Sequence, residues 1–395
     1  MRYLTLFLIL NVLFLFCTQK NDINKNKDSN LKLEETKTEI KIPIDPKTSC
    51  ESWCIQYFND NGKDYLAILN SYENAIQIYD IQDTILKTKM KFDVKGGENA
   101  TNKIKGFKII NKDTVFLTSF IYNIYLTNFD GVIYKKINYW KKATNGGYPF
   151  FNYSLTPIDN SLIYKAPHLL IAQQMIMEKE RNIKYAADVN SKICLDLDIS
   201  SETLRFLEMD HPLFGQKGAN EVVTQYARVF NGSEFVYAPC SDHFIYITKD
   251  HKTVTPKKIK SRLLSENQYG VIGNYKVGQS IEEQLIRAAK AGRYLNMLYD
   301  KYRSVYYRFV KLPSDVGNKY QPNIDYRNDK ISVILIDDKF NILDELPLSE
   351  NLFNWQMAFV NEKGLFISTN NVNNPNFSPD YLSFNLISIN TTSKK

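Results

Sequence analysis

The sequence has few of the residues from which metal sites and active sites are usually built. Its 395 residues include only four histidines, and none of them is spaced as HxH, HxxxH or HExxH. The motifs GxSxG, GxxxxGK[ST] and GxGxxG, which mark many hydrolases and nucleotide-binding proteins, are also absent. The sequence therefore predicts no metal ion and no cofactor.

Charge of one sign is not in large excess. The chain has 50 Lys and Arg against 43 Asp and Glu, a formal net charge of +7, and no Lys/Arg run stands out. Binding to nucleic acid would require a basic patch or stripe. No nucleic-acid partner is therefore expected.

Cysteine is scarce, with five residues in the chain. Cys50 and Cys54 have a CxxxC spacing, which is not a strong zinc or redox signature, and no second pair lies nearby. Because an exported protein can form disulfides, a bond between these two thiols stays open. Cys194 and Cys240 are expected to be small apolar core residues.

A short apolar run lies at the N-terminus. The run covers residues 3–16, with a single Arg before it and Cys17 directly after it. A run of about 14 residues is too short to span a bilayer but suits a signal peptide. A Cys in this place resembles a bacterial lipoprotein signal, with Cys17 as the lipid-attachment residue, although Phe16 is larger than the residue usual there. An uncleaved anchor or an ordinary secretory signal are the alternatives.

A polar segment follows the predicted signal peptide of residues 1–17. Residues 18–38 lack aromatic side chains and predict a flexible tether. The predicted protein is thus exported and attached to the membrane by an N-terminal lipid, at the outer membrane of the cell envelope. The side of that membrane stays open.

Strand-like segments recur about six times between residues 39 and 390. The clearest copy, residues 105–138, reads KGFKII, TVFLTSF, NIYLT and VIYKKIN, with short polar turns between them. Repeats of about 40 to 50 residues with four strands each indicate an all-β, six-bladed β-propeller. The last copy lacks a fourth strand, so we expect residues 39–44 to complete it and close the ring.

One segment departs from the strand pattern. Residues 280–300 carry a capping box, Ser280 with Glu283, followed by apolar residues at helical spacing. They predict a helical insertion between blades 4 and 5. Residues 169–180 are a second helical candidate.

The predicted loops divide between the two faces of the propeller. Short turns emerge on one face, and long loops, among them residues 166–191, 313–329 and 370–380, emerge on the other. Long loops on a rigid scaffold often carry binding function. We therefore expect ligand or partner contacts there, with His168 and His243 among the polar groups.

Four further residues are candidates for binding. Tyr320 and Asn371 lie in the long loops, and Tyr307 and Arg308 lie in the tyrosine-rich stretch YDKYRSVYYRF. The planar donor fork of Arg suits a carboxylate, a sugar or a peptide. The competing and favoured interpretation is that Arg308 is a structural staple. His251, in a short turn, is expected to be solvated.

The stretch YDKYRSVYYRF, the C-terminal NPNFSPDYLSFNLISIN and the LFC of the signal together resemble a Bacteroidota lipoprotein family of unknown function, which is related to six-bladed β-propeller lipoproteins. The resemblance implies an exported, lipid-anchored propeller and supplies no catalytic residues.

The function expected from the sequence is that of a cell-envelope lipoprotein, more readily a binding protein than an enzyme, which binds a protein or glycan ligand on its loop-rich face. One alternative is a hydrolase or lyase that acts on glycans or peptides in the central funnel. Another is a structural subunit of an envelope complex.

Overall fold

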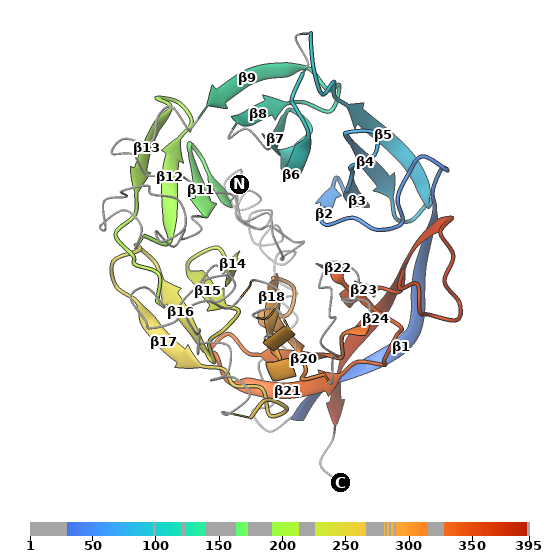
Figure 1. Ribbon diagram of the computed structural model, residues 1–395, viewed down its shortest axis with the longest axis vertical. Helices are drawn as coiled ribbons and strands as arrows, with labels where there is room; N and C mark the ends of the chain where they lie inside the picture. Colours follow the sequence, from blue (N-terminus) through green and yellow to red (C-terminus); the bar gives the residue numbers. More distant parts are fainter. Residues whose placement is uncertain are drawn as a thin grey trace, which may run out of the picture.

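Six four-stranded antiparallel sheets stand around a common axis in the computed structural model, as the blades of a propeller (Figure 1). The structure describes residues 30–97, 100–119, 123–138, 163–172, 192–212, 226–265, 280, 283, 286–287, 290–314 and 328–392. Within these residues, no helix is long and apolar enough to cross a membrane.

The blades are numbered in chain order, and the strands of each blade are given from the innermost to the outermost. Blade 1 contains β2 (Ile55–Asp60), β3 (Lys63–Asn70), β4 (Ala75–Asp80) and β5 (Ile85–Lys91). Blade 2 contains β6 (Ile104–Asn111), β7 (Thr114–Ser119), β8 (Asn123–Thr127) and β9 (Ile133–Asn138). Blade 3 contains β10 (Ile163–Lys165), β11 (His168–Ala172), β12 (Cys194–Asp198) and β13 (Thr203–Phe206).

The other three blades follow the same order. Blade 4 contains β14 (Tyr226–Phe230), β15 (Phe235–Pro239), β16 (Phe244–Thr248) and β17 (Thr255–Lys258). Blade 5 contains β18 (Arg293–Asp300), β19 (Val305–Lys311), β20 (Ile331–Ile336) and β21 (Ile342–Pro347). Blade 6 contains β22 (Asn354–Asn361), β23 (Gly364–Ser368), β24 (Tyr381–Thr392) and, outermost, β1 (Asn30–Pro43).

The hydrophobic core is divided among the spaces between neighbouring blades. Along β7, Val115 and Leu117 pack in a cluster with blade 1, while Phe116 packs in a cluster with blade 3. Successive side chains of a strand point to opposite faces of the sheet. A middle strand is therefore apolar at nearly every position, because blades cover both of its faces.

Short turns join the first to the second strand of a blade and the third to the fourth, and they form the tight-turn face. Many begin with an Asp or Asn whose side chain accepts backbone N–H bonds from the turn. Asp80 accepts from Gln82 and Asp83, and Asp198 accepts from Ser200 and Ser201. Such Asx turns satisfy the backbone locally and fix the hairpin.

The stretch YDKYRS is one of these turns. Asp300 accepts hydrogen bonds from the backbone N–H groups of Tyr302 and Arg303, and Ser304 has a left-handed φ of 55°. The residues join β18 to β19. Their unusual composition therefore reflects a hairpin between the two inner strands of blade 5.

The N-terminal strand β1 pairs antiparallel with β24, and Ile42 lies opposite Leu382. β1 begins at Asn30, so residues 30–38, which were expected to belong to the tether, lie in this strand. Residues 1–29, with the predicted signal peptide and Cys17, lie outside the described residues.

The helical insertion predicted over residues 280–300 is not confirmed. Residues 293–300 form β18, the innermost strand of blade 5, which the sequence left unidentified. Ser280 and Glu283 exchange the two hydrogen bonds of the expected capping box. Several residues between 281 and 289 lie outside the described part of the chain.

Blade 3 also differs from its expected strands. Residues 168–172 form β11, where the sequence predicted a loop and then a helix. β11 is the second strand of the blade, and β10 is the first. The predicted first strand, residues 150–156, lies outside the described residues.

Candidate ligand-binding site

The connections from the second to the third strand of a blade, and from one blade to the next, form the loop-rich face. The connection from β5 to β6, residues 92–103, is one of these loops. Asn74, in the neighbouring β3–β4 turn, holds it at both ends: its amide donates to the carbonyls of Phe92 and Asn102, and its Oδ1 accepts from the N–H of Ile104. Asn74 is 4% exposed, so this loop is anchored from within the protein.

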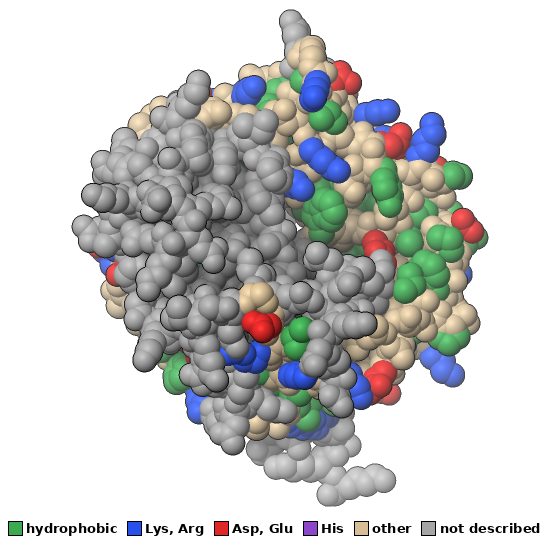
Figure 2. Space-filling model, in the orientation of Figure 1, with side chains coloured by type: hydrophobic (Ala, Val, Ile, Leu, Met, Phe, Trp, Pro, Cys, Tyr) green, Lys and Arg blue, Asp and Glu red, His purple; other side chains and the backbone are tan. Residues whose placement is uncertain are grey.

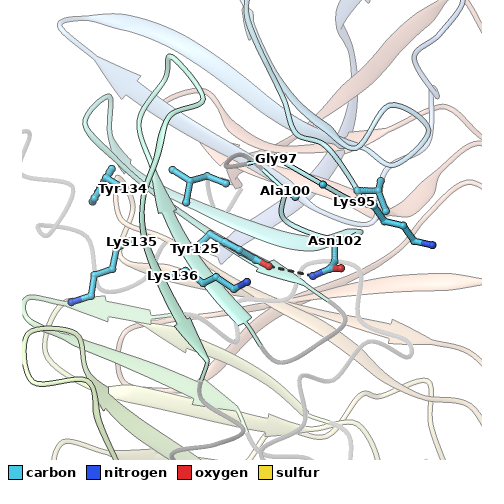
Figure 3. Close-up of a pocket in the computed structure, with 11 residues that line it drawn as sticks. Lys95, Gly97, Ala100, Asn102, Tyr125, Tyr134, Lys135 and Lys136 are labelled. Atoms are coloured by element: carbon cyan, nitrogen blue, oxygen red, sulfur yellow. Dashed lines mark hydrogen bonds between the residues drawn. The ribbon is translucent and has the colours of Figure 1, made fainter.

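A pocket of about 600 Å³ opens beneath this loop (Figure 3). The pocket is lined by residues 94–97, 100 and 102 of the loop, by Tyr125 of β8, and by residues 133–136 of β9. Tyr125 and Ile133 pack with the core cluster between blades 1 and 2. The pocket therefore lies at the outer part of that junction.

Polar groups lie around the floor of the pocket. The Asn102 amide lies 3.4 Å from the Tyr125 hydroxyl, and the Lys136 ammonium lies 5.6 Å from the centre of the Tyr125 ring. Gly96 and Gly97 have φ values of 74° and 78°, which side-chain-bearing residues rarely adopt. Two successive glycines allow the loop to turn over the pocket.

Positive charge dominates the described lining residues, of which three are lysines and none is acidic. Lys95 and Lys136 are exposed. Lys135 points away from the pocket, since its ammonium bonds to the carbonyl of Ile199 at 2.6 Å and lies 3.4 Å from Glu202 (Figure 3). Figure 2 shows Lys and Arg side chains gathered over blade 2, near the top of the view.

Arg308, a predicted candidate, is buried between blades 4 and 5. Its guanidinium donates four hydrogen bonds to backbone carbonyls of blade 4, those of Pro239, Asp242, His243 and Ile259. It also stacks 3.5 Å from the centre of the Tyr294 ring. The residue therefore joins two blades, whereas the sequence placed its structural role at the inserted helix.

Three other candidates are buried as well. His243, on the loop-rich face, lies with its Nδ1 2.6 Å from the hydroxyl of Tyr294. The hydroxyl of Tyr307 donates to Asp300, and burial raises the pKa of this phenol. The Asn371 amide donates to the carbonyl of Phe353 and so fixes the β23–β24 loop. These contacts position the chain and leave little of the side chains to a ligand.

His168 lies on the tight-turn face, and its predicted place on the loop-rich face is wrong. The residue opens β11, directly after the turn from β10. Its Nδ1 lies 3.0 Å from Asp196, which Arg205 also binds. Because His243 is on the opposite face, the two histidines do not converge on one site.

Two further predictions concern the chemistry of single residues. His251 is 4% exposed, where a solvated side chain was expected, and its Nε2 lies 2.7 Å from the hydroxyl of Tyr237. Burial lowers the pKa of His251 to about 4. No disulfide joins Cys50 to Cys54 in the described part of the chain, and Tyr320 lies outside the described residues.

The pocket itself was not predicted. The sequence indicated that residues 94–102 form a long connection, but Tyr125 and Lys136 lie on strands that looked purely structural. The available signal was the glycine pair beside Lys95, in a loop where glycine otherwise has no packing role.

Comparison with known proteins gives a family for the chain and structures with a similar fold. A family model described as "Domain of unknown function (DUF4221)" matches residues 29–347. The fold matches the crystal structure of a DUF4221 member from Bacteroides vulgatus with a TM-score of 0.77 and 22% identity, over 92% of this chain and 99% of that chain. A protein from Bacteroides fragilis, described as a candidate exported protein, matches with a TM-score of 0.54 and 11% identity, over 94% and 98%. No curated protein matches the chain.

Proposed function

The chain belongs to the DUF4221 family, and from the pocket beneath residues 92–103 we propose that it is a binding protein for a small anionic ligand. The observation that carries the proposal is the charge of the pocket, whose described lining includes Lys95 and Lys136, besides the outward-pointing Lys135, and no acidic residue. An anion entering this pocket would gain Coulomb attraction from Lys95 and Lys136 without meeting a like charge from the described lining.

The other groups of the pocket suit an oxygen-rich anion. The Asn102 amide donates one hydrogen to the Tyr125 hydroxyl, and its second hydrogen can donate to an oxygen of a ligand. The volume lies within the range of about 300–1,000 Å³ typical of small-molecule sites. Acidic sugars and sugar phosphates combine this size with carboxylate or phosphate oxygens, and they are the class we propose.

The cellular place of the protein belongs to the same proposal. The apolar run ending at Cys17 supports export and lipid attachment to the cell envelope, and the structural neighbour described as a candidate exported protein supports export. The pairing of β1 with β24 would close the ring and join the membrane tether directly to the sixth blade. The loop-rich face would then be free to meet a ligand.

The geometry favours binding over the hydrolase or lyase alternative. Among the described residues, no three His, Cys, Asp or Glu side chains come together in a way that could hold a metal ion. The pocket instead offers cations and neutral donors, which can hold an anion but cannot act as a carboxylate base.

Calorimetric titration of the full chain tests the proposal. We expect D-glucuronate or glucose 6-phosphate to bind and glucose not to bind. Lys136→Gln should weaken binding by about tenfold, the loss expected for one charge-assisted hydrogen bond. Lys363→Gln, on the tight-turn face, is the matched control and should bind as the wild type does. Equal binding of glucose, or an unchanged affinity in Lys136→Gln, would contradict the proposal.

A further inference from the structure

A second group of polar side chains lies on the innermost strands of blades 5 and 6. β18 begins with Arg293, and β22 begins with Asn354, where each strand leaves the loop-rich face. Asn296 is the fourth residue of β18, and Trp355 is the second residue of β22. The four side chains are almost fully buried, with exposures of 7% for Arg293, 3% for Asn354, 2% for Asn296 and 3% for Trp355.

Each of these four residues has a buried donor atom without a hydrogen-bond partner in the described structure. The atoms are Arg293 Nε, Asn296 Nδ2, Asn354 Nδ2 and Trp355 Nε1. A buried polar group without a partner lowers the stability of the folded state. Native proteins contain few such groups, so four donors on two adjacent strands require an explanation.

The strand pairing is irregular near these side chains. The register of β18 with β19 shifts between Tyr294 and Met297, which includes Asn296. The register of β22 with β23 shifts between Asn354 and Ala358, which includes Trp355. Bulges of this kind redirect side chains and are frequent beside functional sites.

The backbone before Arg293 is also fixed. Gly292 has a φ of 73°, and a Cβ at this position would lie 2.7 Å from Leu264 and 2.8 Å from the carbonyl oxygen of Lys311. Only glycine fits such a conformation and such close contacts. The backbone directly before Arg293 therefore has a fixed conformation.

The two strands are neighbours around the axis (Figure 1). β18 contacts β22, and Leu295 and Trp355 belong to the same apolar cluster. The loop-rich ends of β18 and β22 thus lie beside each other, apart from the pocket of blade 2.

We propose that this cluster is a binding site for a carboxylate group at the loop-rich ends of β18 and β22. All four orphan atoms are donors, and one belongs to a guanidinium, so the complementary ligand supplies only acceptors and a negative charge. A carboxylate meets both conditions with two oxygens. The carboxylate could belong to a peptide C-terminus or to an acidic sugar, which share this chemistry.

Two substitutions distinguish a ligand-binding role of these donors from a structural role. Asn296→Leu and Trp355→Phe each remove one orphan donor and keep most of the side-chain volume. If a ligand normally satisfies the donors, both variants should melt at the same temperature as the ligand-free wild type or higher. Both should bind the carboxylate about tenfold more weakly or worse. A donor with a structural role would give a lower melting temperature and an unchanged affinity.

The titration compares two acids with their neutral counterparts on the full chain: Ala-Ala-Ala with its C-terminal amide, and D-glucuronate with glucose. Tighter binding of the tripeptide acid indicates a peptide terminus, and tighter binding of glucuronate indicates a sugar. Lys136→Gln serves as the control, because it weakens anion binding at the pocket of blade 2 and should leave this site intact. The proposal is overturned if neither acid binds better than its neutral counterpart, or if only Lys136→Gln reduces binding.

Discussion

Replacement of Arg308 tests whether blades 4 and 5 are held together by a single side chain. Arg308 is 1% exposed, and its four hydrogen bonds range from 2.7 to 3.3 Å. Arg308→Ala leaves four carbonyl oxygens of blade 4 without this donor and opens a cavity beside Tyr294. Burial lowers the pKa of Arg308, so a part of the loss is offset by removing a costly buried charge.

The net effect can be estimated from these opposing terms. An unsatisfied buried carbonyl costs about 1–3 kcal/mol, but water entering the cavity would satisfy some of the four. We expect Arg308→Ala to lower the free energy of unfolding by about 4 kcal/mol, in the range of buried polar networks that lose one member. Arg308→Lys keeps the charge but not the planar fork, and it should cost at least about 2 kcal/mol.

Urea unfolding at pH 7, followed by circular dichroism, measures the change, and amide exchange of residues 240–243 shows whether the loss is local. Arg205→Ala is the control, because this side chain is 73% exposed and its ion pair with Asp196 should contribute less than about 1 kcal/mol. An Arg308→Ala variant that unfolds within about 1 kcal/mol of the wild type, yet no longer binds ligand, would refute the structural role.

Further predictions concern the loop anchor, a buried histidine and the membrane anchor. Asn74→Ala should speed amide exchange in residues 92–103 and weaken anion binding at the blade 2 pocket, because three hydrogen bonds to the loop are lost; normal exchange would contradict this. The folded pKa of His251, about 4, lies below its ordinary value of 6.5, so neutral His251 contributes stability above pH 6.5 that is lost as the pH falls toward 4. His251→Gln should flatten that part of the stability profile, and an unchanged profile would argue against it. Cys17→Ala should abolish labelling by a palmitate analogue, and equal labelling of the variant and the wild type would contradict lipid attachment at Cys17.

The family and the propeller were predictable from sequence because the blades repeat one local pattern. The family match confirms the resemblance, and six sheets confirm the blade count. Alternation with period two and turn residues at hairpin positions identify most strands without tertiary information. Asp130-Gly131 and Asn231-Gly232, for example, mark turns between strands that the structure contains.

β18 was missed because burial hides its alternation. Seven of its eight residues are buried, so RYLNMLYD has no polar face, and Leu295 and Leu298 also recur at helical spacing. β11 has the same difficulty, since HLLIA is a short apolar run. Periodicity alone cannot separate a buried strand from a helix of this length. Because β11 was not identified, His168 was predicted on the loop-rich face and not on the tight-turn face where it lies.

The candidate sites depend on contacts that no sequence pattern records. The pocket of blade 2 combines a loop with strands β8 and β9, and its shape depends on Asn74 in another blade. The candidates chosen by residue type, Arg308 and Asn371, serve packing instead. Chemical type identifies which residues can bind a ligand, but burial and partners decide whether their polar atoms remain available.

The distribution of satisfied and unsatisfied polar groups gives a physical reason to place function on the loop-rich face. On the tight-turn face, Asp300 uses both carboxylate oxygens on the hairpin that it begins, and Asp198 uses Oδ1 on its own turn, although Asp80 Oδ2 has no hydrogen-bond partner in the described structure. On the loop-rich side of blades 5 and 6, buried donors such as Trp355 Nε1 have no partner in the described structure. A buried unpaired donor lowers stability and is retained without loss only where another molecule supplies the acceptor. A ligand that binds at the loop-rich ends of β18 and β22 would therefore stabilise the fold more than its contact area alone suggests.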